Sequence, residues 1–455
     1  MSNKLDKKYG LLTAIAMVIG IVIGSGVFFK AEKVLTATGG NLLLGIIAWI
    51  IGGIIMIACA YTFAVMATKY EYVNGVVDYA EATIGKTYGY YVGWFMAVIY
   101  YPTLTSVLAW VSARYTCVLF GFSITGGECM TIACLYLIGA FAMNSLSPVL
   151  AGKFQVSTTI IKLIPLLLMA VVGTIVGITS GMTVANFTIV VEKVDTFSGL
   201  FTAVVATAFA YEGWIIATSI NAELKDAKKN LPRALIGGTF AIMLVYILYY
   251  IGLAGAVSNE TMMAGGEAGA KLAFETVFSS IGGSLIFVFV IISCLGTLNG
   301  LMLGCTRGLY SIAVRGRGPK QDVFKQVDNI TNMPTNSSVI GLLFCGIWLF
   351  FFYGANLTDS WFGFLSFDSS ELPIVTIYAM YIPIFIMMIK KETELGAFKR
   401  FVMPILSICG CIFMMIAACF AHRMAVVAYL IVFVVIMIIG AVFENKAFIK
   451  TQVNK

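Results

Sequence analysis

Twelve apolar stretches, most of them about 20 residues long, divide this sequence and constrain its fold more than any other feature. Such a stretch is long enough to cross the hydrocarbon core of a bilayer as a helix. It has to be helical, because lipid offers backbone N–H and C=O groups no hydrogen-bond partner. The sequence therefore predicts an all-α membrane protein with twelve transmembrane helices. The stretches are 9–31, 41–68, 87–113, 129–149, 154–177, 197–221, 231–257, 279–307, 337–354, 372–389, 401–421 and 424–443.

The composition excludes a soluble protein. Hydrophobic residues make up 60% and charged residues 11% of the 455 residues, whereas soluble domains carry about 25% charge. The net charge of +7 is spread over loops without a long basic run, so we expect no nucleic-acid partner. Most of the ten cysteines fall inside apolar stretches, and the only histidine is His422. We therefore expect no disulfide framework, no metal site and no cofactor, and we expect Cys129 to lie in a loop.

The positions of lysine and arginine orient the chain in the membrane. With the N-terminus placed inside, 22 of the 29 basic residues fall in inner segments and six in outer segments, and Lys162 alone lies within a helix. Cytoplasmic loops of membrane proteins carry such an excess of basic residues. The sequence therefore predicts a multi-pass protein of the cell membrane with both termini in the cytoplasm.

Two of the twelve stretches are interrupted near their centres. The first reads VIGIVIGSGVFF over 18–29, with three glycines and a serine at its middle. Each glycine costs a helix roughly 1 kcal/mol relative to alanine. The sixth contains FAYEG over 209–213, which places an acid and a glycine at membrane depth. Interrupted spans at corresponding positions of two halves are a sequence sign of an inverted-repeat transporter and of its binding site.

The chemistry of such breaks favours an amino-acid substrate. Unwinding the first helix would free the amides of 25–27, which form the positive end of a helix dipole and can hold a carboxylate. The carbonyls of 21–22, with those of Phe209 and Glu212, could hold an ammonium group. An α-amino acid carries both charges and would satisfy both ends. The alternative interpretation is that the glycines are notches for close helix packing.

Five motifs carry a resemblance to a known family. They are VIGIVIGSGVF, TTIIKLIPLLL, FAYEGW, ELKDAKKNLPRA and CLGTLNG, in this order along the chain. The chain resembles the amino acid–polyamine–organocation superfamily, especially its L-type amino acid transporters and the bacterial serine/threonine exchangers. The resemblance implies a LeuT-like five-plus-five inverted repeat within a single transporter domain. Repeat one would cover 9–177, repeat two 197–389, and two additional helices 401–443.

The resemblance also implies roles for individual residues. The backbone of 24–26 would bind the substrate carboxylate, and the ring of Phe209 would be an inner gate. Lys162 would replace the sodium ion that braces the first helix against the fifth in related transporters, and Tyr246 resembles a family tyrosine near that lysine. Apart from the resemblance, the polar Ser293 could line the pocket from the eighth helix. The full set of expected substrate-binding residues is Val22, Ile23, Gly24, Ser25, Gly26, Phe209, Ala210, Tyr211, Glu212 and Ser293.

Alternatives remain open for the polar residues at membrane depth. Lys162 lies roughly 13 Å inside the fifth stretch, where a lysine costs about 2.5–3.5 kcal/mol on insertion scales. The alternative to a functional role is a lysine that reaches back to the interface. Glu212 could be ionised beside Lys162, protonated, or exposed to a wet vestibule. Tyr246 could be a packing residue, and Glu371 could be a vestibule charge or a plain loop residue.

The leading functional hypothesis is a sodium-independent exchanger or facilitator for small to medium neutral amino acids. A proton-coupled symporter that uses Lys162 is the alternative. An ion channel would need rings of charge or carbonyls, and a membrane-embedded enzyme would need a nucleophile and base or metal ligands, which we do not find. Many mammalian family members carry glycine at the position of Glu212 and a cysteine that bonds a heavy-chain partner. Cys129 lies in no matching motif, so we expect no such partner.

Overall fold

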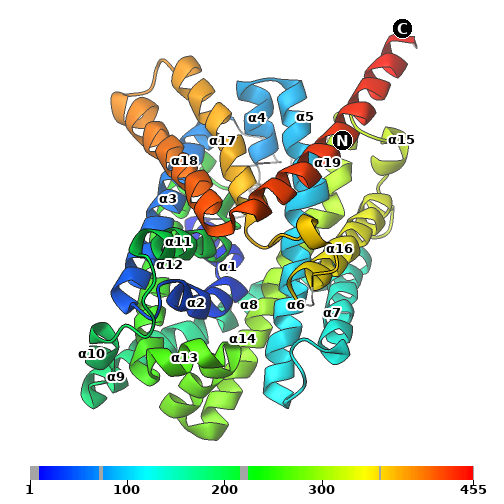
Figure 1. Ribbon diagram of the computed structural model, residues 1–455. Coiled ribbons are helices and arrows are strands. Elements are labelled where there is room, and N and C mark those ends of the chain that lie inside the picture. The colour runs from blue at the N-terminus through cyan, green and yellow to red at the C-terminus, as the bar shows by residue number, and fades with distance from the viewer. Residues whose placement is uncertain (1–9, 71–74, 216–223, 358–359, 454–455) are drawn as a thin grey trace.

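The computed structural model describes residues 10–70, 75–215, 224–357 and 360–453, and its elements over these residues are helical (Figure 1). Short π or 3-10 segments are labelled η. The elements are α1 (Leu11–Val22), α2 (Ser25–Ala37), α3 (Leu42–Lys69), α4 (Val76–Thr83), α5 (Lys86–Phe95), η1 (Met96–Tyr100), α6 (Tyr101–Phe120), α7 (Gly127–Leu146), α8 (Pro148–Leu168), η2 (Met169–Gly173), α9 (Thr174–Ser180), α10 (Met182–Thr188), α11 (Thr196–Tyr211), α12 (Ala227–Ala256), α13 (Asn259–Gly265), α14 (Glu267–Ala313), α15 (Gln321–Phe324), α16 (Thr335–Asn356), η4 (Gly363–Leu365), α17 (Leu372–Lys391), η5 (Phe398–Val402), α18 (Met403–His422) and α19 (Met424–Val453).

Ten helices of the described residues are long and apolar enough to cross a membrane. They correspond to ten of the twelve predicted stretches, and the first and sixth stretches are the two that are missing from this set. The first is divided between α1 and α2, and α11 is the first part of the sixth. The multi-pass helical architecture is thus confirmed, whereas the count of twelve spans and the inverted repeat stay predictions.

Both interruptions lie where the sequence places them. Ile23 (φ −69°, ψ 111°) and Gly24 (φ −154°, ψ −138°) leave the helical conformation between α1 and α2. In the sixth stretch α11 ends at Tyr211, and Glu212 is extended (φ −78°, ψ 160°). Gly213 follows with φ 104°, a conformation that side chains with a Cβ rarely adopt. The last part of this stretch, 216–221, lies outside the described residues.

The expectation that Cys129 lies in a loop is wrong. The fourth spanning helix, α7, begins at Gly127, two residues before the predicted apolar stretch. Its first turn accommodates the acidic Glu128, because the amino end of a helix favours negative charge. Cys129 is therefore helical and fully buried.

Close packing around the broken helices depends on glycine. The helix α12 contacts both α3 and α1, and it also crosses the π segment η2. A Cβ added at Gly252 would lie 2.1 Å from the Met169 carbonyl oxygen, and one at Gly255 would lie 2.2 Å from the Gly173 carbonyl oxygen. Small residues allow membrane helices to approach this closely.

We expect Gly252→Leu to destabilise the fold. The added side chain would separate α12 from η2, and overpacking of this kind costs about 1–3 kcal/mol. The matched control is Gly237→Leu on the same helix, where a Cβ meets nothing within 4 Å. Thermal unfolding in detergent should show a lower midpoint for Gly252→Leu alone. Equal midpoints for the two variants would contradict the close contact.

Candidate functional site

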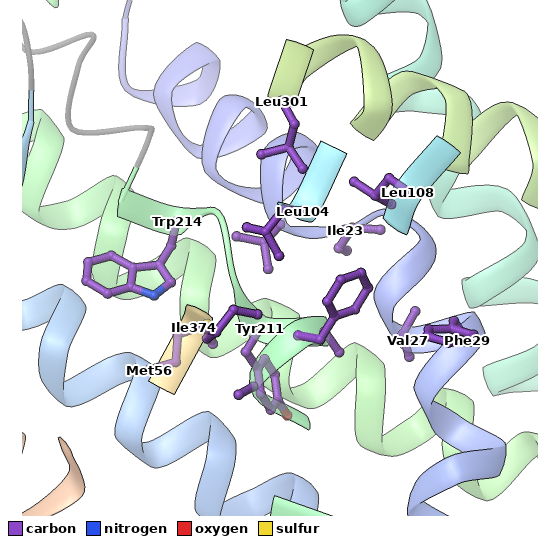
Figure 2. Packing of buried hydrophobic residues seen from close by; sticks show 14 of the residues in the cluster. Ile23, Val27, Phe29, Met56, Leu104, Leu108, Tyr211, Trp214, Leu301 and Ile374 are labelled. Carbon is purple, nitrogen blue, oxygen red and sulfur yellow. The ribbon is translucent and has the colours of Figure 1, made fainter. Parts of the chain in front are cut away.

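The two helix breaks meet in the buried centre of the bundle. Ile23 is 1% exposed, Phe209 6% and Glu212 7%. Figure 2 shows that apolar side chains of other helices gather around Ile23, among them Leu104 and Leu108 of α6. The backbone groups at the breaks are therefore shielded from water in this conformation, where polar interactions are stronger than in solvent.

The break in the first helix frees a defined set of backbone groups. In an unbroken helix, the amides of 24–27 would donate to the carbonyls of 20–23, four residues earlier. Here Ile23 is the last residue before the break whose amide makes such a bond, at 2.8 Å to the Ile19 carbonyl. Four carbonyls and four amides thus lose their helical partners at one place, and each of them needs another partner.

The amides lie at the amino end of α2. Its N-cap residue is Gly24, which has no side chain to cap these amides. The hydroxyl oxygen of Ser25 is buried and has no hydrogen-bond partner among the described residues. A buried polar group without a partner costs about 1–3 kcal/mol, which a ligand could recover. This end of the break is suited to a carboxylate.

Glycines at the break also serve helix packing. A Cβ on Gly24 would lie 2.1 Å from Oγ1 of Thr297, and a Cβ on Gly26 would lie 2.5 Å from Cα of Ala210. The packing alternative is therefore correct for the contacts of these two glycines. Packing does not explain why the amides at the break lack helical partners, so it does not exclude a binding role for these amides.

The buried Lys162 satisfies one of the freed carbonyls. Its Nζ donates to the Gly20 carbonyl at 2.7 Å and lies 3.0 Å from Oγ1 of Thr297, and the side chain is fully buried. The lysine thus takes the place of the Gly24 amide. The Gly20 carbonyl lies one residue before 21–22, whose carbonyls are expected to hold an ammonium group. A lysine that reaches back to the interface is excluded in this conformation, because its ammonium group points into the bundle.

Tyr246 of α12 connects the two breaks to each other. Its hydroxyl oxygen lies 3.1 Å from both the Val22 carbonyl and the Ala210 carbonyl, near the ends of α1 and α11. The single hydroxyl proton can be donated to either carbonyl. Tyr246 also stacks on Tyr211, with 5.3 Å between the ring centroids. This tyrosine therefore does more than pack, and its hydroxyl contacts carbonyls at the two breaks.

Glu212 is paired with a residue that the sequence analysis did not identify. One carboxylate oxygen accepts a hydrogen bond from the hydroxyl of Tyr100, and the other has no partner among the described residues. The side chain is buried, so the wet-vestibule alternative does not describe this conformation. Tyr100 lies in the π segment η1, a feature that is frequent at functional sites but has no signature in a single sequence.

Two residues of α14 complete the surroundings of the breaks. Ser293 is fully buried, and its hydroxyl oxygen has no hydrogen-bond partner in the described part of the chain. Thr297 lies one turn further on, where its Oγ1 is 3.3 Å from the Ser293 carbonyl and also meets Lys162. The CLGTLNG motif contains Thr297, but the sequence alone assigned it no role. Within the described residues, no cluster of three histidine, cysteine or acidic side chains could hold a metal ion.

An ion pair lies beside the Phe209 ring. Lys30 of α2 is fully buried, and its Nζ lies 2.5 Å from Glu371 and 5.2 Å from the Phe209 ring centroid. Nε2 of His422 lies 2.9 Å from the other Glu371 carboxylate oxygen. Glu371 precedes the span of α17. Burial raises the pKa of its carboxyl, but Lys30 and His422 outweigh burial and hold this pKa below its usual range. Glu371 is thus an ion-pair partner rather than a plain loop residue.

Comparison with known families now decides the class of protein. A model of the amino acid permease family matches residues 9–442, nearly the whole chain. The chain belongs to the amino acid permease family. This confirms its resemblance to the amino acid–polyamine–organocation superfamily. The permease is a multi-pass membrane transporter of amino acids, and it is not an enzyme.

Individual relatives agree with this assignment. The permease is 30% identical over 420 residues to the serine/threonine exchanger SteT of Bacillus subtilis (strain 168), covering 91% of each chain. It is 27% identical to the large neutral amino acids transporter small subunit 2 of Mus musculus, covering 72% of the permease and 62% of that relative. Its fold resembles the crystal structure of MhsT in complex with L-phenylalanine, with a TM-score of 0.59, 15% identity and coverage of 95% and 99%. At that identity the structural likeness supports the fold alone.

We expect Lys162→Ala to slow transport strongly. The variant leaves the Gly20 carbonyl without its charged donor, and hydrogen bonds to charged groups contribute about 1.5–3 kcal/mol. Such a loss corresponds to about tenfold or more in rate. The control is Lys153→Ala, an exposed lysine of the same helix. Initial rates of labelled amino-acid exchange in proteoliposomes, normalised to folded protein, should fall only for Lys162→Ala. Equal rates would contradict a role for this lysine.

Proposed function

We propose that this permease is a sodium-independent exchanger or facilitator for small to medium neutral L-amino acids. It would act in the cell membrane by alternating access, with both termini in the cytoplasm and without a heavy-chain partner. The observation that carries the proposal is the hydrogen bond from the buried Lys162 ammonium to the Gly20 carbonyl. The full burial of Cys129 supports the absence of a partner bonded through that thiol.

Lys162 supports sodium independence because it supplies a cation at the broken helix. Carbonyl oxygens at the carboxyl end of a half-helix attract positive charge, which a transporter can provide as a bound ion or as a side chain. A covalently attached ammonium needs no ion gradient to remain in place. It joins α8 to α1, and through Thr297 it also reaches α14.

The substrate would lie between the two breaks. Its carboxylate would accept hydrogen bonds from the amides of 25–26 and from the Ser25 hydroxyl. Its ammonium group would meet the carbonyls at Val22, Phe209 and Glu212. Val22 already accepts from Tyr246, but a carbonyl oxygen has a second lone pair for a substrate donor.

The surroundings of the breaks favour a neutral side chain of limited size. Figure 2 shows apolar side chains around Ile23, including Leu104, Leu108 and Leu301. Apolar walls select by size and offer a charged side chain no partner. Among the residues that the structure describes, Glu212 is the acid at the breaks, and one of its oxygens accepts a hydrogen bond from Tyr100.

Closure over the substrate would combine the Phe209 ring, as the inner gate, with the Lys30–Glu371 ion pair on the outer side of that ring. The ion pair joins α2 to the start of α17, and the ring lies beside the ammonium group. Release of substrate to the outside would require these contacts to separate. Phe209 would then act as a gate that moves between states rather than as a fixed wall.

The alternative is a proton-coupled symporter. The buried carboxylate of Glu212, hydrogen-bonded to Tyr100, is the observation that favours it, since intramembrane acids mark proton paths in transporters. In that mechanism Lys162 or Glu212 would gain and lose a proton in each cycle.

Uptake into proteoliposomes separates the two mechanisms. For the exchanger, labelled neutral amino acid should enter rapidly only when amino acid is present inside. For the facilitator, entry should follow the concentration gradient without accumulation. Both rates should be indifferent to sodium and to a pH gradient. Accumulation driven by a pH gradient into vesicles without amino acid would establish the symporter instead, and accumulation driven by sodium would overturn the role of Lys162.

Substrate recognition should require both charged ends. The α-amino amide and the α-hydroxy acid each leave buried backbone groups without a partner, which costs about 1–3 kcal/mol. Each analogue should therefore compete at least about tenfold more weakly than the parent amino acid. The control is the amino acid with one more side-chain methylene, which keeps both charges. Equal competition by either analogue would contradict binding of a zwitterion.

Glu371→Gln should open the outer side more often. Removing one partner of a buried ion pair costs about 3–5 kcal/mol, and here the cost falls on the closed state. Access to the site from outside is measured as the rate at which a membrane-impermeant thiol reagent modifies the cysteine of a Ser25→Cys variant. The protein with its native cysteines alone gives the background rate. Modification of the introduced cysteine should become at least about tenfold faster with Glu371→Gln. The control is Glu260→Gln, an exposed acid of α13. Unchanged modification would show that the ion pair does not close the site.

A further inference from the structure

A groove remains on the lateral surface of the molecule, away from the helix breaks. It lies between α7 and α16, which are neighbours on the right of Figure 1, and its volume is about 580 Å³. Volumes of roughly 300–1,000 Å³ are typical of small-molecule sites. The lining is almost wholly apolar. It includes Met130, Cys134 and Leu137 of α7 and Gly346, Leu349 and Phe350 of α16.

The groove spans one half of the membrane. On α7 its lining runs from Gly127, the first residue of the helix, to Ile138. On α16 it runs from Leu342 to Tyr353, three residues before the helix ends. Each of these ranges rises about 17 Å along its helix axis. One leaflet contributes about 15 Å of the ~30 Å hydrocarbon core, so the groove reaches from one interface to the middle of the bilayer.

Aromatic residues mark the interfacial end of the groove. Trp361 lines it there, and its ring lies 5.3 Å from that of Tyr353 and 5.6 Å from that of Phe350. Tryptophan and tyrosine are enriched at the level of the lipid headgroups. In the orientation proposed above, this end faces the outer leaflet.

The groove is continuous with the lipid-facing surface. On the same two helices, Leu135 is 62% exposed, Leu343 54% and Ile347 53%. Both helices are membrane spans, so hydrocarbon has to cover these side chains. The same hydrocarbon has direct lateral access to the groove.

We propose that the groove binds one acyl chain of a phospholipid from the leaflet at the amino end of α7. An acyl chain is apolar, has the length of one leaflet and ends at mid-bilayer, as the groove does. A spanning helix of a partner or of a second copy passes through both leaflets and is about 10–12 Å wide. A groove confined to one leaflet therefore fits the chain better than the helix.

Filling the groove tests the proposal. A Cβ added at Gly346 meets nothing within 4 Å, so Gly346→Phe should fold while its ring occupies the groove. The matched control is Gly139→Phe on α7, which is equally open but lies outside the lining. Gly127→Leu, at the interfacial end, is a second filling variant, and a Cβ there also meets nothing within 4 Å.

The probe is a phosphatidylcholine with a photoreactive diazirine in one acyl chain, incorporated into proteoliposomes with the full-length protein. Peptide mapping should find the label concentrated in 127–138 and 342–353 relative to the exposed face of α19. Gly346→Phe should reduce the label there by at least about fivefold, because the ring fills the space of the chain. Gly139→Phe should not. Label spread evenly over the lipid-facing helices, or unchanged in both filling variants, would overturn the proposal. Oxidative crosslinking of Cys134 between two copies would assign the groove to a second copy instead.

Discussion

A lysine ammonium group that is buried in the middle of the bundle is the interaction on which the rest of the site depends. A charged lysine at that depth is costly unless it meets hydrogen-bond acceptors. The break in the first helix creates such an acceptor, because the Gly20 carbonyl loses the amide that an unbroken helix would offer it. Lys162 then donates to this carbonyl at 2.7 Å. Without the lysine, the break would leave the Gly20 carbonyl without this donor. Without the break, the ammonium group would lack this acceptor.

The need of each backbone group for a hydrogen-bond partner also links the lysine to the proposed substrate site. When Lys162 and Tyr246 satisfy carbonyls of α1, the amides at the start of α2 stay available for a carboxylate. Tyr246 also reaches the carbonyl of Ala210 in the sixth segment, so one hydroxyl is shared by both broken helices. A substrate bound between the breaks would add its own charges to this set. In the proposed mechanism, substrate binding and the positions of the two half-helices would be coupled through these backbone groups.

Much of this arrangement could be predicted from single segments of the sequence. The contacts that could not be predicted share one reason. The interrupted helices and the depth of Lys162 follow from local composition, because glycine and charge are unfavourable in a spanning helix. The pairing of Lys30 with Glu371 joins residues 341 positions apart, and no local pattern reports such a contact. The same holds for Tyr100 and Glu212, 112 positions apart, and for Thr297 beside Gly24. The start of α7 was misplaced because a polar first turn resembles a loop in composition.

We propose that Lys162 is a fixed cation that keeps its proton throughout the transport cycle. Counting protons tests this role, with a pH-sensitive dye inside proteoliposomes that contain no amino acid at the start and are given a gradient of one neutral amino acid from outside. The internal pH should not change with the native protein, whatever amount of amino acid enters. Movement of about one proton per amino acid, abolished in Lys162→Ala, would contradict it and make the lysine a proton carrier.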